Sequence, residues 1–194
     1  MKKLLLSAFI FLMASAIMAQ DIPKGLAVND KAPSFSATDQ NGKSVSLEDL
    51  ISKGPVVLVF YRGQWCPYCN KQLSQLQDSI SLILSKGATL VAVTPEISEN
   101  VQKTISKTNA SYPILSDKDL KIMKLYDVAY AVDSKTIEKY KKYGIDFNQA
   151  NGDNGANLPV PAIYIVNKSG IITYVHFDAD YTKRGSVKEI LDHL

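Results

Sequence analysis

The stretch that decides the fold is PVVLVFYRGQWCPYC, which runs from Pro55 to Cys69. Its first half is a continuous apolar, β-branched run, typical of a strand buried on both faces of a sheet. Its second half ends in Cys66 and Cys69, with two residues between them. Beyond this pair, apolar side chains recur at helical spacing as far as Lys86, which predicts one helix that begins at the cysteines. These apolar positions are Leu73, Leu76, Ile80, Ile83 and Leu84.

The spacing of the two cysteines favours reversible redox chemistry. A structural disulfide across two residues would remove little entropy from the unfolded chain, because that stabilisation grows with loop length. A zinc site needs about four ligands, whereas the chain has no second cysteine pair and only two histidines, His176 and His193. Two neighbouring thiols suit two-electron exchange, in which one attacks and the other resolves. We therefore predict a redox-active pair and no metal or other cofactor.

The junction of strand and helix distinguishes the two thiols. Pro67 occupies a position that the first turn of a helix tolerates. The free N–H groups and the positive end of the helix dipole predict a lowered pKa for Cys66. Cys69 lies one turn further in, so we expect it to be more buried and less acidic. Cys66 is the predicted nucleophile and Cys69 the predicted resolving thiol.

The N-terminus has the layout of a secretory signal peptide. Lys2-Lys3 precedes the uncharged apolar run Leu4–Met18, which ends among small residues. The run is shorter than the ~20 residues of a membrane span, and no nearby cysteine could accept a lipid. We expect removal of residues 1–19, with cleavage after Ala16 or Ala19 both possible. The protein is therefore expected in the periplasm or cell envelope, or secreted, without a stable membrane anchor.

Composition indicates one ordinary globular domain. The chain has 194 residues, of which 46% are hydrophobic and 21% charged, which excludes a disordered or polytopic membrane protein. We expect a single domain over residues 25–194 after the signal peptide. The formal charge is +3, and removal of Lys2 and Lys3 leaves +1. This gives no electrostatic reason to expect a nucleic-acid partner.

Strand and helix signals alternate along the domain, and the chain closes with a hairpin and a helix. This order predicts an α/β fold with a mixed central sheet and helices on both faces. Residues 133–158 interrupt the order with a polar, charged insertion, which is either a solvated linker or a lid over the cysteines. The expected strands are 35–38, 55–61, 88–94, 113–115, 161–166 and 171–175, and the later helices are 46–50, 99–107, 117–125 and 187–194.

The motif Trp65-Cys66-Pro67-Tyr68-Cys69 resembles the active site of the thioredoxin fold, and its central Pro-Tyr is the dipeptide typical of glutaredoxins. From about Gly25 to the C-terminus the chain resembles the peroxiredoxin-like redoxins of the alkyl hydroperoxide reductase and thiol-specific antioxidant (AhpC/TSA) group. The resemblance implies a thioredoxin-like fold with the insertion ahead of a cis-proline strand. The segments that carry it are Asn29–Phe35, Asp39–Lys43, Tyr112–Asp117 and Leu158–Ala162.

The resemblance also implies supporting residues around the cysteines. Pro161 would be the cis-proline facing the pair, and Val160 would line the substrate groove. Trp65 is either a packing residue beneath the active-site turn or a platform for substrate. Pro67 and Tyr68 complete the expected site.

The chain departs from the typical peroxiredoxin pattern Pro-x-x-x-Thr-x-x-Cys. Val59 and Gly63 stand where that pattern has proline and threonine. Typical peroxiredoxins also use an arginine to bind the peroxide. Arg62 or Arg184 could supply this arginine, because a guanidinium suits a thiolate or a peroxide oxygen. Both could equally be surface residues placed by chance.

Two enzymatic hypotheses share this site. In the first, the Cys66 thiolate reduces a hydroperoxide and then forms a disulfide with Cys69. A thioredoxin-like dithiol reduces this disulfide and so restores the thiol pair. In the second, Cys66 exchanges with disulfides of envelope proteins, as the CPYC motif and the absent threonine favour. A third hypothesis is a binding module whose thiols do not cycle. Resemblance over most of the chain favours the peroxidase.

Overall fold

The computed structural model describes residues 23–194. The predicted signal peptide, residues 1–19, lies outside this range. Within it, no helix is both long and apolar enough to cross a membrane.

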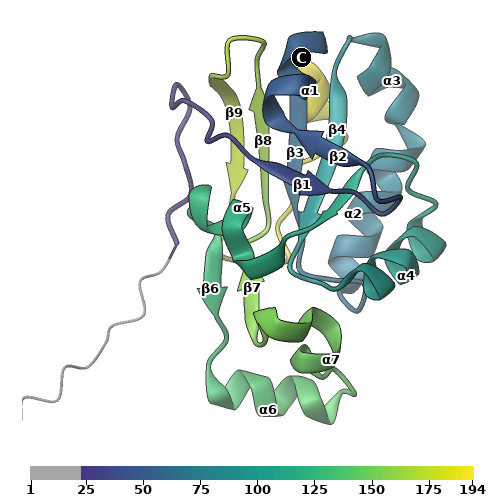
Figure 1. The fold of residues 1–194 in the computed structure, drawn as a ribbon, viewed down its shortest axis with the longest axis vertical. Helices are drawn as coiled ribbons and strands as arrows, with labels where there is room; N and C mark the ends of the chain where they lie inside the picture. The colour runs from purple at the N-terminus through teal and green to yellow at the C-terminus, as the bar shows by residue number, and fades with distance from the viewer. Residues whose placement is uncertain (1–22) are drawn as a thin grey trace, which may run out of the picture.

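A five-stranded mixed sheet forms the centre of the domain, in the order β5-β4-β3-β8-β9 (Figure 1). The middle strand, β3, pairs in parallel with β4 and antiparallel with β8. β4 pairs in parallel with β5, and β8 forms an antiparallel hairpin with β9. The predicted mixed sheet is therefore present. Its strands are β3 Val56–Phe60, β4 Thr89–Thr94, β5 Ile114–Ser116, β8 Ala162–Val166 and β9 Ile172–Phe177.

Strand β3 is buried on both faces, as its apolar run predicts. Leu58 and Phe60 pack into one hydrophobic cluster, whereas Val57 and Val59 pack into another on the opposite face. The second cluster also contains Cys66 and Cys69, so the cysteine pair is continuous with the core.

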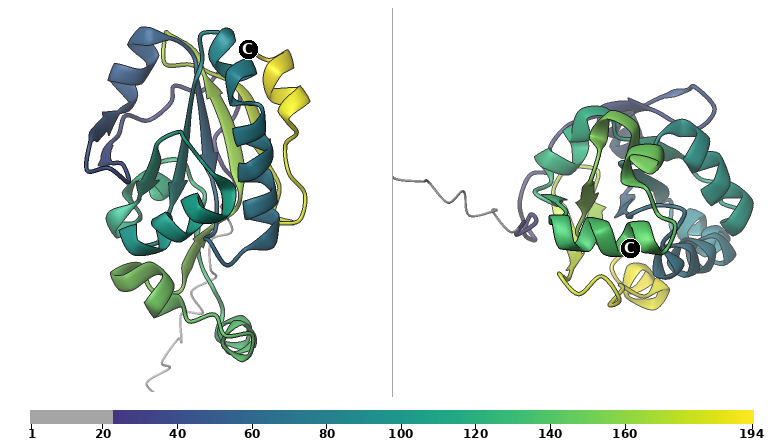
Figure 2. Two further views of the ribbon diagram at one scale, coloured as in Figure 1. Left: turned by 90° about the vertical axis from the view of Figure 1, so that its right-hand side faces the viewer. Right: turned by 90° about the horizontal axis from the view of Figure 1, so that it is seen from below.

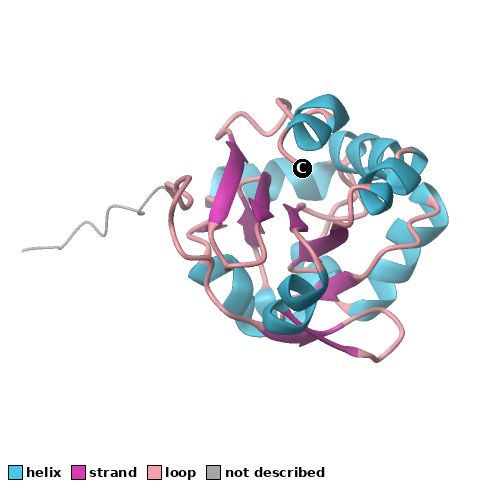
Figure 3. Ribbon diagram, turned by 90° about the horizontal axis from the view of Figure 1, so that it is seen from above, coloured by secondary structure: helices cyan, strands magenta, loops and turns pink. Residues whose placement is uncertain are grey.

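Helices cover both faces of the sheet (Figures 2 and 3). Apolar side chains of α2, α3, α4 and α8 join the cluster that holds the cysteines, whereas α1, α5 and the small hairpin β1–β2 join the other. The bounds are β1 Ser36–Thr38, β2 Ser44–Ser46, α1 Leu47–Lys53, α2 Pro67–Asp78, α3 Ile80–Ser85, α4 Ser98–Thr108, the 3-10 turn η1 Lys118–Leu120, α5 Lys121–Leu125 and α8 Val187–Asp192.

The helix predicted to run from the cysteines to Lys86 is divided in two. Ser79 ends α2 with φ −105° and ψ 8° and precedes α3. Its backbone N–H still donates to the carbonyl of Gln75, four residues earlier, so the break lies in the backbone angles of Ser79 itself. Apolar periodicity persists across this break, which is why the sequence pattern does not reveal it.

The polar insertion is a folded unit. The hairpin of β6 (Ala129–Ala131) and β7 (Asn157–Pro159) carries α6 (Ser134–Lys142), α7 (Phe147–Asn151) and the 3-10 turn η2 (Gly152–Asn154). Both α-helices lie beyond one end of the central sheet (Figures 1 and 2). They enclose a small core of their own, in which Val132, Phe147 and Leu158 are buried and Trp65, Tyr130, Ile137, Tyr140, Ile145 and Ala156 pack around them.

The expected cis-proline is not present, since residues 23–194 contain no cis peptide bond. Instead, Val160 donates its N–H to the carbonyl of Val128 at 2.8 Å. This bond extends the β6–β7 pairing by one residue, so the chain passes through Pro161 into β8 without a turn.

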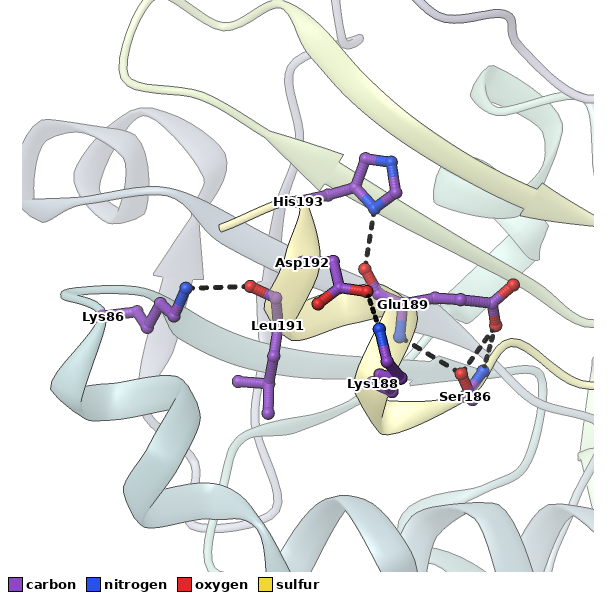
Figure 4. A network of polar contacts seen from close by, with 7 residues as sticks. All are labelled: Lys86, Ser186, Lys188, Glu189, Leu191, Asp192 and His193. Atoms are coloured by element: carbon purple, nitrogen blue, oxygen red, sulfur yellow. Dashed lines mark hydrogen bonds and ion pairs between the residues drawn. The ribbon is translucent and has the colours of Figure 1, made fainter.

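The C-terminal helix α8 is fixed at both ends (Figure 4). Ser186 and Glu189 form a reciprocal capping box at its start, which satisfies two otherwise free N–H groups. Lys86 donates to the carbonyl of Leu191 at 2.9 Å near its end. This helix follows Arg184 directly, so its anchoring restricts where Arg184 can lie.

Candidate active site

Two free cysteines face each other at the start of α2. Cys66 is the N-cap residue, and its Sγ accepts a hydrogen bond from the Cys69 N–H at 3.4 Å. The two sulfurs lie 2.6 Å apart, and both side chains are buried. This arrangement allows them to share a proton or to join as a disulfide.

Arg184 supplies a cation to both sulfurs. Its Nη2 lies 3.4 Å from the Sγ of Cys69 and 3.9 Å from that of Cys66. Gln72, one turn after Cys69, accepts from Nη1 at 3.2 Å, and the Tyr181 carbonyl accepts from Nε at 2.8 Å. The guanidinium is thus held from two sides.

The charge distribution of the pair differs from the sequence prediction. The hydrogen bond with Cys69, followed by burial, raises the pKa of Cys66. Burial also tends to raise the pKa of Cys69, but the hydrogen bond with Cys66 and the nearby Arg184 lower it to about 6. The pair therefore carries one shared thiolate, centred on the sulfur nearer Arg184. The predicted lower pKa of Cys66 is wrong for this arrangement, because the hydrogen bond with Cys69 and the burial of the Cys66 sulfur outweigh the effect of the helix terminus.

A cavity of about 450 Å³ leads to Cys66 and not to Cys69. The active-site turn contributes Trp65, Pro67 and Tyr68 to its wall. The insertion contributes the opposite wall, so α6 and the residues after it cover the cysteine pair. The remaining residues of the lining are Arg62, Thr136, Lys139, Tyr140, Tyr143, Ile145 and Tyr181.

Arg62 belongs to the cavity wall, and its backbone forms a hydrogen bond with the Cys69 sulfur, whereas its side chain is directed to the insertion. Its side chain is 3% exposed and donates through Nη2 to the Tyr140 hydroxyl. Its guanidinium lies 4.2 Å from the ring centre of Tyr181 and 5.1 Å from that of Trp65. These contacts join the active-site turn to the insertion.

Trp65 packs beneath the insertion, against Tyr140 and Phe147, with ring centres 5.3 and 5.7 Å away. Tyr68 is 44% exposed and lies edge-on to Tyr181. Val160 and Pro161, both expected at the substrate groove, do not line the cavity.

Gly63 has no space for a side chain. A Cβ atom there would lie 2.6 Å from the Trp65 Nε1 and 2.8 Å from the Glu96 Oε1. The threonine of the typical peroxiredoxin pattern therefore cannot be accommodated at this position without displacing one of these groups. Arg184 is the polar side chain that reaches both sulfurs instead.

Several residues of the site are not identified by the sequence analysis. Tyr140 and Lys139 lie in the insertion, where the charged pattern indicates only a solvated helix. Gln72 could be found from its position one turn after Cys69, which places it on the same helical face. Glu96 carries no comparable signal, because its burial depends on packing between distant segments.

Within residues 23–194, no cluster of three or more potential ligands could hold a metal ion. The fold and the paired thiols define a thiol-dependent oxidoreductase of the thioredoxin-fold class. Residues 28–175 match the AhpC/TSA family, and the chain belongs to this family.

Two curated relatives represent different activities. A Helicobacter pylori protein named as a peroxiredoxin, bcp, is 35% identical over 169 residues, which cover 87% of this chain and 98% of its own. The thiol-disulfide oxidoreductase ResA of Bacillus cereus is 29% identical over 115 residues. That alignment covers 59% of this chain and spans 65% of the ResA length.

Solved structures agree on the fold. Peroxidoxin BcpB from Mycobacterium tuberculosis superposes with a TM-score of 0.63 at 20% identity, covering 78% of this chain and 86% of its own. A peroxiredoxin-like protein from Aquifex aeolicus gives a TM-score of 0.65 at 15% identity, with 88% and 87% covered. The predicted thioredoxin-like fold is confirmed.

Proposed function

We propose that the protein is an exported peroxiredoxin-like peroxidase that works through a Cys66–Cys69 dithiol/disulfide cycle. The observation that carries the proposal is a facing thiol pair in contact with Arg184, of which Cys66 opens into a cavity. Charge from Arg184 keeps one thiolate available near neutral pH. The relative with nearly full-length coverage is also named as a peroxiredoxin.

In the cycle, a thiolate on Cys66 attacks the outer oxygen of a hydroperoxide. The O–O bond breaks, an alcohol or water leaves, and Cys66 becomes a sulfenic acid. The Cys69 thiol then attacks this sulfur, which forms the disulfide and releases water. A thioredoxin-like dithiol donor reduces the disulfide and is itself oxidised.

Disulfide exchange is the second candidate. The cavity of about 450 Å³ is much larger than hydrogen peroxide requires and carries four tyrosines and a tryptophan. Such a wall suits an organic hydroperoxide or a peptide bearing a disulfide. The ResA relative favours exchange on the part of the chain that it covers.

Stopped-flow oxidation of the reduced protein separates the two functions. The peroxidase predicts rapid loss of both thiols on addition of an organic hydroperoxide and slow reaction with a model protein disulfide. The reverse order of rates would support the exchange enzyme and contradict the peroxidase.

Export rests on the N-terminal pattern of Lys2-Lys3 and the apolar run Leu4–Met18. We expect protein recovered from the native cell envelope to begin after Ala16 or Ala19. An N-terminus still at Met1 on that material would contradict export.

A further inference from the structure

Glu96 is a buried carboxyl group that the proposed cycle does not use. It follows β4, and its side chain is completely inaccessible to solvent. Oε2 accepts the Gln64 N–H at 2.8 Å, whereas Oε1 has no hydrogen-bond partner among the described residues. Fully buried carboxyls are rare because ionisation there is costly. Oε1 is therefore free to carry a proton.

Charged and titratable groups surround Glu96 from three elements. Tyr61 faces it from the end of β3, Cys69 from α2, and Lys103 and Lys107 from α4. Neither lysine forms an ion pair with it in the described part of the chain. Lys107 donates to Gln64, and Lys103 donates to the Asn100 side chain at 2.8 Å. Glu96 is thus not neutralised by a fixed partner.

The electrostatic interaction with the cysteine pair opposes a second negative charge. Burial raises the pKa of Glu96 to about 8, and a thiolate on Cys69 adds to the increase, although the Gln64 N–H and the lysines oppose it. In a low-dielectric interior, two neighbouring acids do not readily ionise together. While the reduced pair holds one thiolate, Glu96 accordingly retains its proton near neutral pH.

Glu96 also lines a second cavity, of about 510 Å³, that shares no residue with the cavity at Cys66. The other carboxylates in this lining are Asp39, Glu99, Asp117 and Asp153.

We propose that Glu96 stores the proton that the cysteine pair requires on oxidation: protonated while the pair is reduced, it ionises when the disulfide forms. This inference rests on the proposed cycle of Cys66 and Cys69 but not on the identity of the oxidant. Glu96 touches no reacting atom, so its part is to balance charge through Cys69 and to hold the active-site turn through Gln64.

The proton count supports this role. A pair with one thiol and one thiolate reacts with a hydroperoxide to give a disulfide, an alcohol and water only if one further proton is supplied. The Glu96 carboxyl supplies it, so the combined charge of Glu96 and the cysteine pair is −1 before and after the reaction. Reduction by a dithiol returns one proton to Glu96 and leaves one on the pair, and disulfide exchange has the same balance.

Oxidation by diamide tests the proposal without any natural substrate. Diamide takes two electrons and two protons as it converts two thiols to a disulfide. In weakly buffered solution near pH 7, we expect the wild-type protein to take up no proton from solution per disulfide formed. An uptake of one proton per disulfide would overturn the proposal. Inactivity toward hydroperoxides, by contrast, would contradict only the peroxidase function.

Two variants assign the effect to one carboxyl. Glu96→Gln should take up one proton per disulfide, whereas Glu99→Gln, an exposed residue lining the same cavity, should behave as the wild type. The reduction potential should likewise fall with pH about twice as steeply in the wild type as in Glu96→Gln. Equal slopes, or no proton uptake by Glu96→Gln, would assign the proton to another group.

Discussion

At the scale of single residues, charge and access are divided between the two cysteines. Arg184 lies closer to Cys69, which lowers the pKa of that thiol, whereas only Cys66 lines the cavity. With the sulfurs 2.6 Å apart, a proton can pass between them, so the accessible sulfur can become the thiolate when it attacks. The assignment of Cys66 as nucleophile therefore rests on access and not on its helix position.

The first prediction tests these roles by removing one thiol at a time. Cys66→Ser should lose all turnover, because Cys69 is shielded from the cavity. Cys69→Ser should react once and then stop as a sulfenic acid or a mixed disulfide, since no internal thiol resolves it. Mass spectrometry after one equivalent of oxidant identifies the species. Continued turnover of Cys66→Ser would reverse the roles.

The second prediction concerns Arg184. Replacement by methionine removes the cation beside both sulfurs, so the pKa of Cys69 should rise from about 6 toward its ordinary value. At pH 7 the rate of thiol alkylation should fall by about twofold to tenfold, as expected for a rise of roughly one to two pKa units from about 6. Lys183→Met, which removes an exposed neighbouring charge, is the matched control. An unchanged alkylation profile for Arg184→Met would exclude Arg184 as the stabilising cation.

At the scale of elements, local patterns predict the core strands and the start of α2. The buried run before the cysteines identifies β3. Asp117, where the helix over residues 117–125 is expected to begin, accepts from the N–H groups of Ile122 and Met123. The insertion could not be predicted in the same way. Its small core depends on Trp65, and its hydrogen bond to Arg62 joins residues 78 positions apart.

The third prediction tests whether that bond holds the insertion over the site. Tyr140→Phe keeps the ring but removes the hydroxyl that accepts from the buried Arg62 guanidinium, at a cost of about 1–3 kcal/mol. We expect faster hydrogen exchange in residues 134–154 than in the wild type. Tyr143→Phe, which alters a 71% exposed residue after the same helix, should leave exchange unchanged. Equal exchange in both variants would show that ring packing alone positions the insertion.

At the scale of the whole molecule, buried titratable groups couple the redox site to folding. The alternation of strands and helices predicts a mixed sheet, but it leaves the order of the strands open. In the structure β3 lies at the centre of the sheet, and Glu96 and Cys69 are buried together. No local pattern indicates that Glu96 is inaccessible, because its neighbours come from β3, α2 and α4. Its burial is a property of the assembled fold.

The last prediction follows from the sign of this coupling. Glu96 has a folded-state pKa of about 8, above its ordinary value of 4.5, so its stabilising contribution is complete below the ordinary pKa and is lost as pH rises through about 8. Cys69 acts in the opposite direction, because its lowered pKa adds stability that is lost as pH falls through about 6.

Comparison with Glu96→Gln isolates the carboxyl. In reduced protein, the free energy of unfolding of the wild type relative to Glu96→Gln should fall between pH 5 and pH 8, by at most about 1.4 kcal/mol per pH unit. Urea denaturation at several pH values measures this difference, and Glu99→Gln should show no comparable trend. A difference independent of pH would mean that Glu96 is ionised in the folded protein throughout this range, as it is in the unfolded chain.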